Sequence, residues 1–198
     1  MALRAPTERV VVATDRDPEL LGLVRPLVRS AVGSDELQLP GAEGAGDSFA
    51  SSAALRARQI ARIAGVAAFA SDSGLVVDAL GGAPGVRQTS HDRPVGPLVR
   101  RLYAALPEAR IAEGLSAARV YAVALAWPDG YSEAFEARLD GRLVHPPPAE
   151  PVHTWDELFV PTGHEVPLAT LPDEVRRTLD PRGRAVQRLG EAWIRGAA

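Results

Sequence analysis

Short apolar runs alternate with amphipathic stretches over the first seventy residues of the chain. Arg9–Thr14 (RVVVAT) is rich in β-branched residues, and this predicts a buried first strand. Pro18 suits the first turn of a helix, and apolar residues then recur at helical spacing at Leu20, Leu21, Val24, Leu27 and Val28. Leu37–Leu39 predicts a second short strand.

A longer helix is predicted from about Phe49 to Ala64, after a loop rich in Gly and Ala. Asp47 or Ser48 stands where a helix N-cap is expected. Ala67–Ala70 follows as another short apolar run. The resulting order of strand, helix, strand, helix and strand favours an α/β core.

The pattern changes after residue 110, where strands follow one another directly. Ala118–Trp127 predicts a long strand, and Pro128–Gly130 is a strong turn signal before a second strand at Tyr131–Leu139. Asp140–Gly141 predicts another turn, and Arg142–His145 a third strand. These features predict a three-stranded meander.

Three further helices are predicted at Pro94–Leu106, Leu171–Thr178 and Arg182–Arg195. Joining an α/β part to a meander suggests two lobes on one long sheet, with a groove between them. No internal repeat interrupts this arrangement, so we expect residues 1–198 to form a single domain of two lobes.

The composition excludes several kinds of chemistry. The 198 residues include no Cys, which excludes thiol catalysis, thiolate metal sites and disulfides. All 22 cationic side chains are Arg, so Schiff-base and general-base chemistry on Lys is also excluded. The net charge of −3 argues against binding to nucleic acid or an anionic membrane. With no long apolar segment and no signal-peptide pattern at the N-terminus, we expect a cytoplasmic protein.

The segment Ser71–Val86 (SDSGLVVDALGGAPGV) is the strongest candidate for chemistry. Asp72 directly follows an apolar strand and is flanked by Ser73 and Gly74. A carboxylate at a strand end beside flexible backbone is a common place for metal binding or water activation. An ordinary polar hairpin would show the same spacing. The segment is not a Walker loop, because the Gly-Lys-Ser/Thr element is absent.

This segment resembles the signature of the inosine/xanthosine triphosphate pyrophosphatase family, DDSGLxVDALGGxPGV. Other segments match that family in the expected order: the opening strand Val10–Thr14, Ser48–Arg58 (resembling TFxENAxxKAR), the hairpin Ala118–Gly141, Trp155–Phe159 (resembling YDPIF) and Asp180–Ala185 (resembling SHRGxA). The resemblance spans nearly the whole chain. It implies an α/β fold with an elongated, twisted mixed sheet flanked by helices and a central cleft between two lobes.

The resemblance also implies an activity and a set of site residues. Members of this family hydrolyse nucleoside triphosphates to monophosphates and pyrophosphate with Mg²⁺, prefer deaminated purines and form homodimers. Asp72 is the catalytic candidate and a candidate metal ligand. Glu19 is a candidate metal ligand by its own chemistry, as a carboxylate that could replace the one the family has at position 51. Carried over residue by residue, the candidate substrate-binding positions are Thr14, Arg16, Arg56, Ser73, Gly74, His153, Trp155, Asp156, Arg176, Asp180 and Arg182.

Several of these positions depart from the family pattern on the phosphate side. Arg16 and Glu19 stand where the family has Asn and Lys, and the second change reverses a charge. Ser51 replaces a metal-binding Glu, and Ser71 replaces the first Asp of DDSG. Arg56, like Arg176, replaces a Lys and keeps the cationic charge. Since Mg²⁺ often takes one or two protein carboxylates, Asp72 could suffice, with Glu19 as a second.

The base side departs as well, and this predicts a shifted base preference. Asp180 and Pro181 replace Ser and His of the SHR element, while Arg182 is kept. Pro181 offers no side-chain donor and an ionised Asp180 only accepts, which suits an amino group better than a 6-oxo group. In an alternative interpretation Asp180 caps the last helix. His153 and Trp155 are candidates for base stacking or for core packing.

Three functions remain open at this stage. The first is an active nucleotide pyrophosphatase with altered base preference, and the second a non-catalytic descendant that binds a nucleotide or a partner. The third is a structural dimer subunit with an empty cleft. A zinc site is disfavoured because the four His lack ligand spacing, and a hydrolase triad because no G-x-S-x-G elbow is present.

Overall fold

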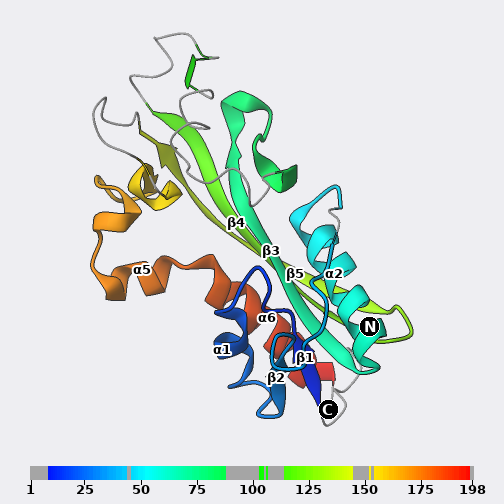
Figure 1. Ribbon diagram of the computed structural model, residues 1–198. Helices are drawn as coiled ribbons and strands as arrows, with labels where there is room; N and C mark the ends of the chain where they lie inside the picture. The colour runs from blue at the N-terminus through cyan, green and yellow to red at the C-terminus, as the bar shows by residue number, and fades with distance from the viewer. Residues whose placement is uncertain are drawn as a thin grey trace. The chain divides into compact units, whose positions relative to one another are not determined.

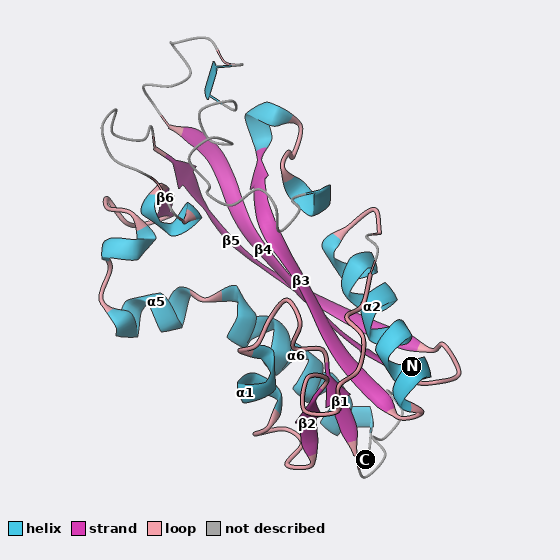
Figure 2. Ribbon diagram, viewed as in Figure 1, coloured by secondary structure: helices cyan, strands magenta, loops and turns pink. Residues whose placement is uncertain are grey.

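A mixed six-stranded sheet with flanking helices forms the fold of this computed structural model, as predicted (Figures 1 and 2). The structure describes residues 9–43, 46–87, 103–104, 106, 114–144, 152 and 154–196. The strand order is β2-β1-β3-β4-β5-β6. No helix in the described part of the chain is both long and apolar enough to cross a membrane.

The parallel part of the sheet is centred on β1 (Val10–Val12), which is fully buried. It pairs with β2 (Ala31–Gly33) on one side and with β3 (Ala67–Val77) on the other. The chain reaches β2 through α1 (Leu20–Val24) and then crosses back to β3. In open parallel sheets, the carboxyl end of a strand at such a switch point is where ligands bind.

The predicted second strand at Leu37–Leu39 is wrong, because the strand lies earlier at Ala31–Gly33. The N–H of Gln38 donates to the carbonyl of Asp35 (3.0 Å) and that of Leu39 to the carbonyl of Ser34 (2.9 Å). The segment therefore forms a turn, in which Gln38 takes a positive φ of 53°.

The long predicted helix is confirmed as α2 (Phe49–Ala64). Ser48 caps its N-terminus, and Gly65 ends it with a left-handed φ of 69°. Its buried face is made of small and branched side chains, among them Ala53, Ala57 and Ile60. In Figure 2, α2 lies on the opposite side of the sheet from α1 and α6 (Pro181–Gly196).

The meander is confirmed, but its third strand is not the predicted one. β4 (Leu115–Ala126) is followed by β5 (Ser132–Leu143), which runs through the predicted turn at Asp140–Gly141. The third strand is β6 (Phe159–Pro161), antiparallel to β5. A Cβ at Gly141 would lie 2.3 Å from the carbonyl oxygen of Val160, so glycine here permits close strand approach rather than a turn.

Two compact units divide the chain by its internal contacts. The first comprises residues 1–73, 121–137 and 181–198, and the second residues 74–120 and 138–180. Each has its own apolar core: the first packs α1 and α6 on one face of the sheet, and the second surrounds Leu75, Leu143 and Phe159. A single domain of two lobes with a cleft stays a prediction.

The C-terminal helices are confirmed as α5 (Asp173–Leu179) and α6. Pro181 is the first residue of α6, a position that suits proline because its missing N–H would have no helical partner there. The helix predicted at Pro94–Leu106 lies almost entirely outside the described residues.

Candidate active site

The residues of the first unit that carry polar chemistry meet just beyond the carboxyl end of β1. They come from the loop between β1 and α1, from the first two turns of α2 and from residues 71–72 of β3. This is the switch point at which the parallel strands diverge. The fold therefore brings three segments that are separate in the sequence together at this end of β1.

Arg56 of α2 is the buried cation of this site, with only 2% of its side chain exposed. Its Nη2 donates to both carboxylate oxygens of Asp15, at 3.1 and 3.2 Å. Its Nη1 donates to the backbone carbonyl of Ser71 at 2.5 Å. Its Nε is buried without a hydrogen-bond partner among the described residues. A buried charge needs such compensation, so Asp15 serves as the counter-ion.

Asp72 leaves β3 on the side of α2 and is half-buried. Burial raises the pKa of its carboxyl, while the positive charges of Arg56 and Arg16 and a hydrogen bond from Ser52 oppose the rise. The hydroxyl oxygen of Ser52 also accepts from the N–H of Gly46 at 2.9 Å. Asp72 is thus a carboxylate in a partly desolvated setting, held by a buried serine.

Ser71 points to the other face of β3 and is buried at 3% exposure. Its hydroxyl donates to Oδ2 of Asp17 at 2.8 Å, and the hydroxyl of Tyr121 donates to the same oxygen at 2.5 Å. Sequence analysis singled out neither Asp15 nor Asp17. The only signal was the density of acids in the opening loop, and their partners lie 41 or more residues away.

Thr14 and Glu19, two other predicted residues of the opening loop, also have partners. The Thr14 hydroxyl donates to the Asp35 carboxylate at 2.6 Å, which lowers the pKa of Asp35. Glu19 forms an ion pair with Arg182 at the start of α6. The predicted role of Glu19 as a metal ligand stays a prediction, and in this structure its carboxylate carries a cationic partner.

Ser51, at the position of the family's metal-binding Glu, serves the helix. Its N–H donates to the Ser48 hydroxyl at 3.1 Å, and its own hydroxyl oxygen accepts from the N–H of Ser48 at 2.9 Å. The pair forms a capping box, which satisfies two N–H groups at the helix start. No carboxylate therefore enters the site from this position.

The remaining predicted substrate-binding residues that the structure describes belong to the second unit, apart from Ser73 and Arg182. Trp155 packs partly buried against that unit's core, and Asp156 pairs with Arg119 at 2.9 Å. Arg176 pairs with Asp173 on α5, and Asp180 follows the last residue of that helix. His153 lies outside the described residues, while Ser73 and Gly74 lie within β3.

The side chains of this site fit a magnesium ion held by one protein carboxylate, and they do not fit a site built from several. No group of three or more His, Asp or Glu that could hold a metal ion occurs among the described residues. Asp72 is a half-buried carboxylate, and burial leaves its negative charge incompletely stabilised. The residues therefore fit an ion held by one protein carboxylate, with water and phosphate oxygens supplying its remaining ligands.

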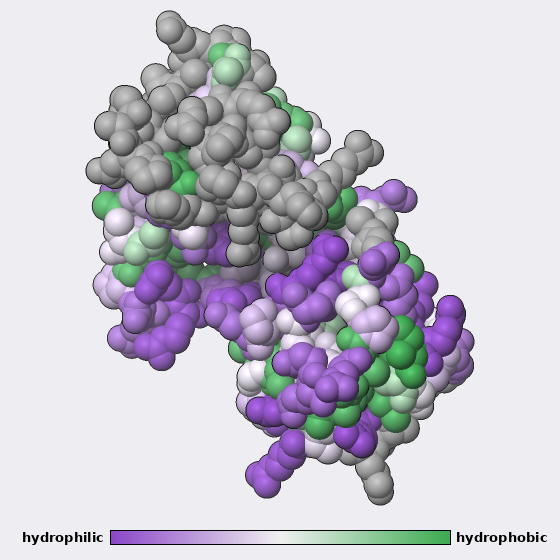
Figure 3. Space-filling model, viewed as in Figure 1, coloured by the Kyte–Doolittle hydropathy of each residue, from purple (hydrophilic) through white to green (hydrophobic). Residues whose placement is uncertain are grey.

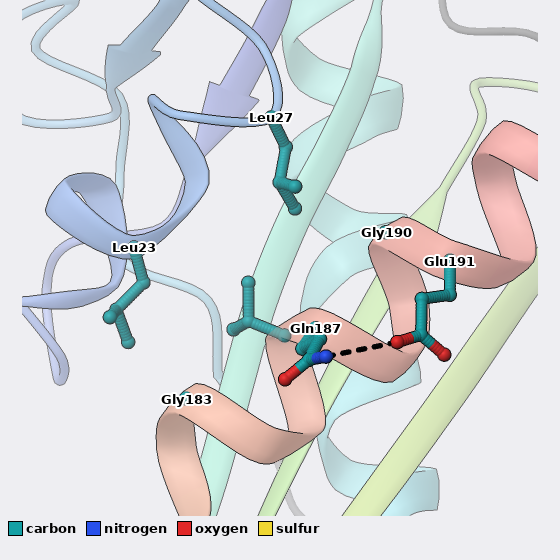
Figure 4. Close-up of a pocket in the computed structure, with 7 residues that line it drawn as sticks. Leu23, Leu27, Gly183, Gln187, Gly190 and Glu191 are labelled. Carbon is teal, nitrogen blue, oxygen red and sulfur yellow. Dashed lines mark hydrogen bonds between the residues drawn. The ribbon is translucent and has the colours of Figure 1, made fainter. Parts of the chain in front are cut away.

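A separate groove of about 320 Å³ lies between α1 and α6 (Figure 4). Leu23, Leu27 and Val186 line it together with Gly183 and Gly190 of α6, and none of the predicted site residues takes part. The face drawn in Figure 3 shows hydrophobic and hydrophilic residues interspersed. The groove is apolar and is not the candidate active site.

Comparison with known proteins places this arrangement in a family. A dITP/XTP pyrophosphatase from Rhodopseudomonas palustris is 34% identical over 197 residues, covering 96% of this chain and 94% of that protein. Another from Rhodospirillum centenum is 37% identical over 174 residues, covering 86% of each chain. The crystal structure of a nucleoside-triphosphatase/dITP/XTP pyrophosphatase from Mycobacterium abscessus superposes with a TM-score of 0.70 at 30% identity, covering 91% of this chain and 98% of that one. Residues 23–192 match the Ham1 family, and the chain therefore belongs to the Ham1 family.

Proposed function

We propose that this protein is a nucleoside triphosphate pyrophosphatase with Asp72 as its catalytic carboxylate and a base preference shifted away from deaminated purines. The relatives named dITP/XTP pyrophosphatases support the reaction class. The observation that carries the proposal is Asp72 itself, a half-buried carboxylate at the sheet's switch point with a raised pKa.

Asp72 is suited to accept a proton from an attacking water. A general base works best when its pKa lies nearer the working pH than that of an ordinary carboxylate. Burial moves the pKa of Asp72 in that direction, and the hydrogen bond from Ser52 fixes the side chain. In the proposed reaction, water attacks the α-phosphorus and the bond to the pyrophosphate leaving group breaks.

Phosphate charge needs neutralisation that the arginines alone do not supply. Arg56 is paired with Asp15 and Arg182 with Glu19, so both cations already carry carboxylate partners. When bound with the substrate to Asp72, Mg²⁺ would supply positive charge to the phosphate oxygens. We therefore expect pyrophosphate release to require the metal.

The base preference rests on Asp180, Pro181 and Trp155. Asp180 lies between α5 and α6, and Pro181 is the first residue of α6. An ionised carboxylate facing a 6-oxo group is repulsive, and an unmatched buried polar group costs about 1–3 kcal/mol. That cost would lower kcat/KM for inosine triphosphate roughly 5- to 150-fold if it appears in the transition state.

The test is pyrophosphate release with and without Mg²⁺ across inosine, xanthosine, cytidine, adenosine and modified-base triphosphates. We expect metal-dependent release, with inosine triphosphate a poor substrate. A tenfold or greater preference for inosine triphosphate would end the proposal of shifted preference. Asp180→Ser, which restores a family residue, should raise kcat/KM for inosine triphosphate, whereas Glu174→Ser on α5 should leave it unchanged.

A non-catalytic nucleotide-binding protein is the second candidate function. It is favoured by Ser51, which supplies a capping box in place of a metal ligand, and by the internal pairing of Arg56. Thermal stabilisation by a nucleotide without any pyrophosphate release across the panel would support it. A homodimer in the cytoplasm is also part of the proposal, from family resemblance, and sedimentation as a strict monomer would contradict the dimer.

A further inference from the structure

We propose that Asp17 is a positioning residue that fixes Asp72 in place through Ser71, an inference that rests on the proposed function of Asp72. Asp17 lies between Arg16 and Glu19 in the opening loop, at a position for which the family resemblance specifies no residue. Its carboxylate nevertheless accepts a hydrogen bond from Ser71, the residue immediately before Asp72.

Ser71 is held through both its backbone and its side chain. Its carbonyl accepts from Arg56 of α2, and its hydroxyl donates to Asp17 of the loop after β1. Tyr121 of β4 donates to the same Asp17 oxygen. Three elements distant in sequence therefore meet at the residue immediately before Asp72.

Asp17 acts on Asp72 indirectly. Successive side chains of a strand point to opposite faces, and Ser71 and Asp72 follow this rule on β3. The contacts of Asp17 lie on the Ser71 face, whereas Ser52 and Arg56 approach Asp72 from α2. Holding Ser71 sets the backbone from which Asp72 projects.

The contact between Asp17 and Ser71 depends on the Asp17 oxygen as a hydrogen-bond acceptor and not on its negative charge. Both donors are neutral hydroxyls, and both donate to Oδ2 of Asp17. No cation lies within ion-pair distance of Asp17 among the residues that the structure describes. An asparagine oxygen could accept the same two hydrogen bonds, so charge and geometry can be separated by substitution.

The pair of Asp17 and Ser71 also departs from the family pattern at position 71. The resemblance places a carboxylate at position 71, where this chain has a hydroxyl. Here the carboxylate comes from the loop after β1 and the hydroxyl from β3. The pairing of an acid with a hydroxyl is therefore expected to survive a swap of the two side chains.

The experiment compares Asp17→Asn with Asp17→Ala in pyrophosphate release. We expect Asp17→Asn to retain kcat within about threefold, and Asp17→Ala to lose about 10- to 100-fold in kcat with little change in KM, since misplacement by about 1 Å can cost about 100-fold. Glu133→Ala is the matched control, because it removes the acceptor of the Tyr131 hydroxyl (2.6 Å) elsewhere in the first unit. It should leave kcat unchanged.

The swap D17S/S71D should recover most of the activity that S71D alone loses, because S71D by itself places two carboxylates together. If Asp17→Ala does not fold, Tyr121→Phe, which removes one of the two donors, should give a smaller loss in kcat. The proposal is overturned if Asp17→Asn is as damaging as Asp17→Ala, if neither Asp17→Ala nor Tyr121→Phe lowers kcat, or if the swap gives no recovery.

A second readout does not depend on activity. The amide resonances of Ser71, Asp72 and Ser73 should move and lose exchange protection in Asp17→Ala, but not in Asp17→Asn or Glu133→Ala. Inactive wild-type protein would contradict the proposed function, while these resonances would still report on Asp17. Unchanged resonances in Asp17→Ala, together with an active wild type, would contradict the positioning role alone.

Discussion

The two compact units of this chain build their candidate chemistry in different ways. In the first unit, Arg56 and Ser71 are almost fully buried and joined in a connected set of hydrogen bonds. In the second, Asp156 and Arg176 make isolated ion pairs with a third or more of each side chain exposed. Buried connected groups fix geometry, whereas exposed ion pairs contribute little and tolerate substitution. The difference teaches that the first unit holds its polar groups in a fixed geometry, whereas the second holds them in pairs that tolerate substitution.

Asp72→Asn should produce the largest effect. Loss of a general base typically costs about 10²- to 10⁴-fold in turnover. Asp78→Asn, which alters another carboxylate of the same motif, is the control and should leave kcat unchanged. Near-normal turnover in Asp72→Asn would remove the catalytic role from the first unit.

Asp72→Asn should not lose stability at neutral pH. Burial raises the pKa of Asp72 in the folded state, so the folded protein is penalised once the pH rises through that raised value. Asparagine carries no charge and avoids the penalty. Thermal unfolding at neutral pH should therefore give a Tm at or above that of the wild type, and a clear drop would contradict this account of the pKa.

Arg56→Ala and Arg119→Ala compare a buried ion pair with an exposed one. Breaking a buried ion pair costs about 3–5 kcal/mol. We expect Arg56→Ala to cost about 3 kcal/mol, because the Asp15 side chain left behind is 26% exposed. Arg119→Ala breaks the exposed pair with Asp156 and should cost less than about 1 kcal/mol. Urea unfolding of both variants measures the difference, and equal losses would break the comparison.

Ser51→Glu should sharpen the comparison by adding a carboxylate to the first unit. Glu at this position can still form the capping box, so stability should hold. By resemblance to the family, we expect the Mg²⁺ concentration for half-maximal turnover to fall about tenfold, equivalent to 1.4 kcal/mol. Ala50→Glu adds the same charge one position earlier in the helix and should not reproduce the effect.

Thr14→Val should have the smallest effect on stability, and that effect should depend on pH. The Thr14 hydroxyl lowers the pKa of Asp35, so its stabilising contribution is present above the ordinary pKa and is lost as pH falls through the lowered one. Thr14→Val should therefore be less stable than Thr14→Ser at neutral pH. The difference in urea unfolding between the two variants should narrow as the pH falls below the ordinary pKa of a carboxyl, and a difference that grows with acidity would contradict the assignment.

Local signals were enough to predict some elements of the fold. Ser48 and the apolar spacing after it determine α2, and Pro128–Gly130 determines the turn between β4 and β5, because each depends on neighbours in sequence. Gly141 was misread as a turn because its close partners, Phe159 and Val160, come from a later strand. The sequence alone could not show that contact.

The candidate site was predictable only where a motif marked it. The signature Ser71–Val86 marked Asp72, and the segment Ser48–Arg58 marked Arg56 through its resemblance to the family. The resemblance assigns no role to Asp15 or Asp17, and their roles arise from partners that the fold brings from α2, β3 and β4. Such tertiary pairings leave no periodic trace in the sequence.

The boundaries between the two units limit how the coding sequence of this chain can change during evolution. Three of them fall inside β3, β4 and β5, and the fourth falls between Asp180 and Pro181. Neither unit is therefore one continuous stretch of coding sequence. Recombination cannot exchange, duplicate or delete one unit as a cassette, and an expressed fragment would end in the middle of a strand. The two units must consequently evolve together in this chain, one substitution at a time.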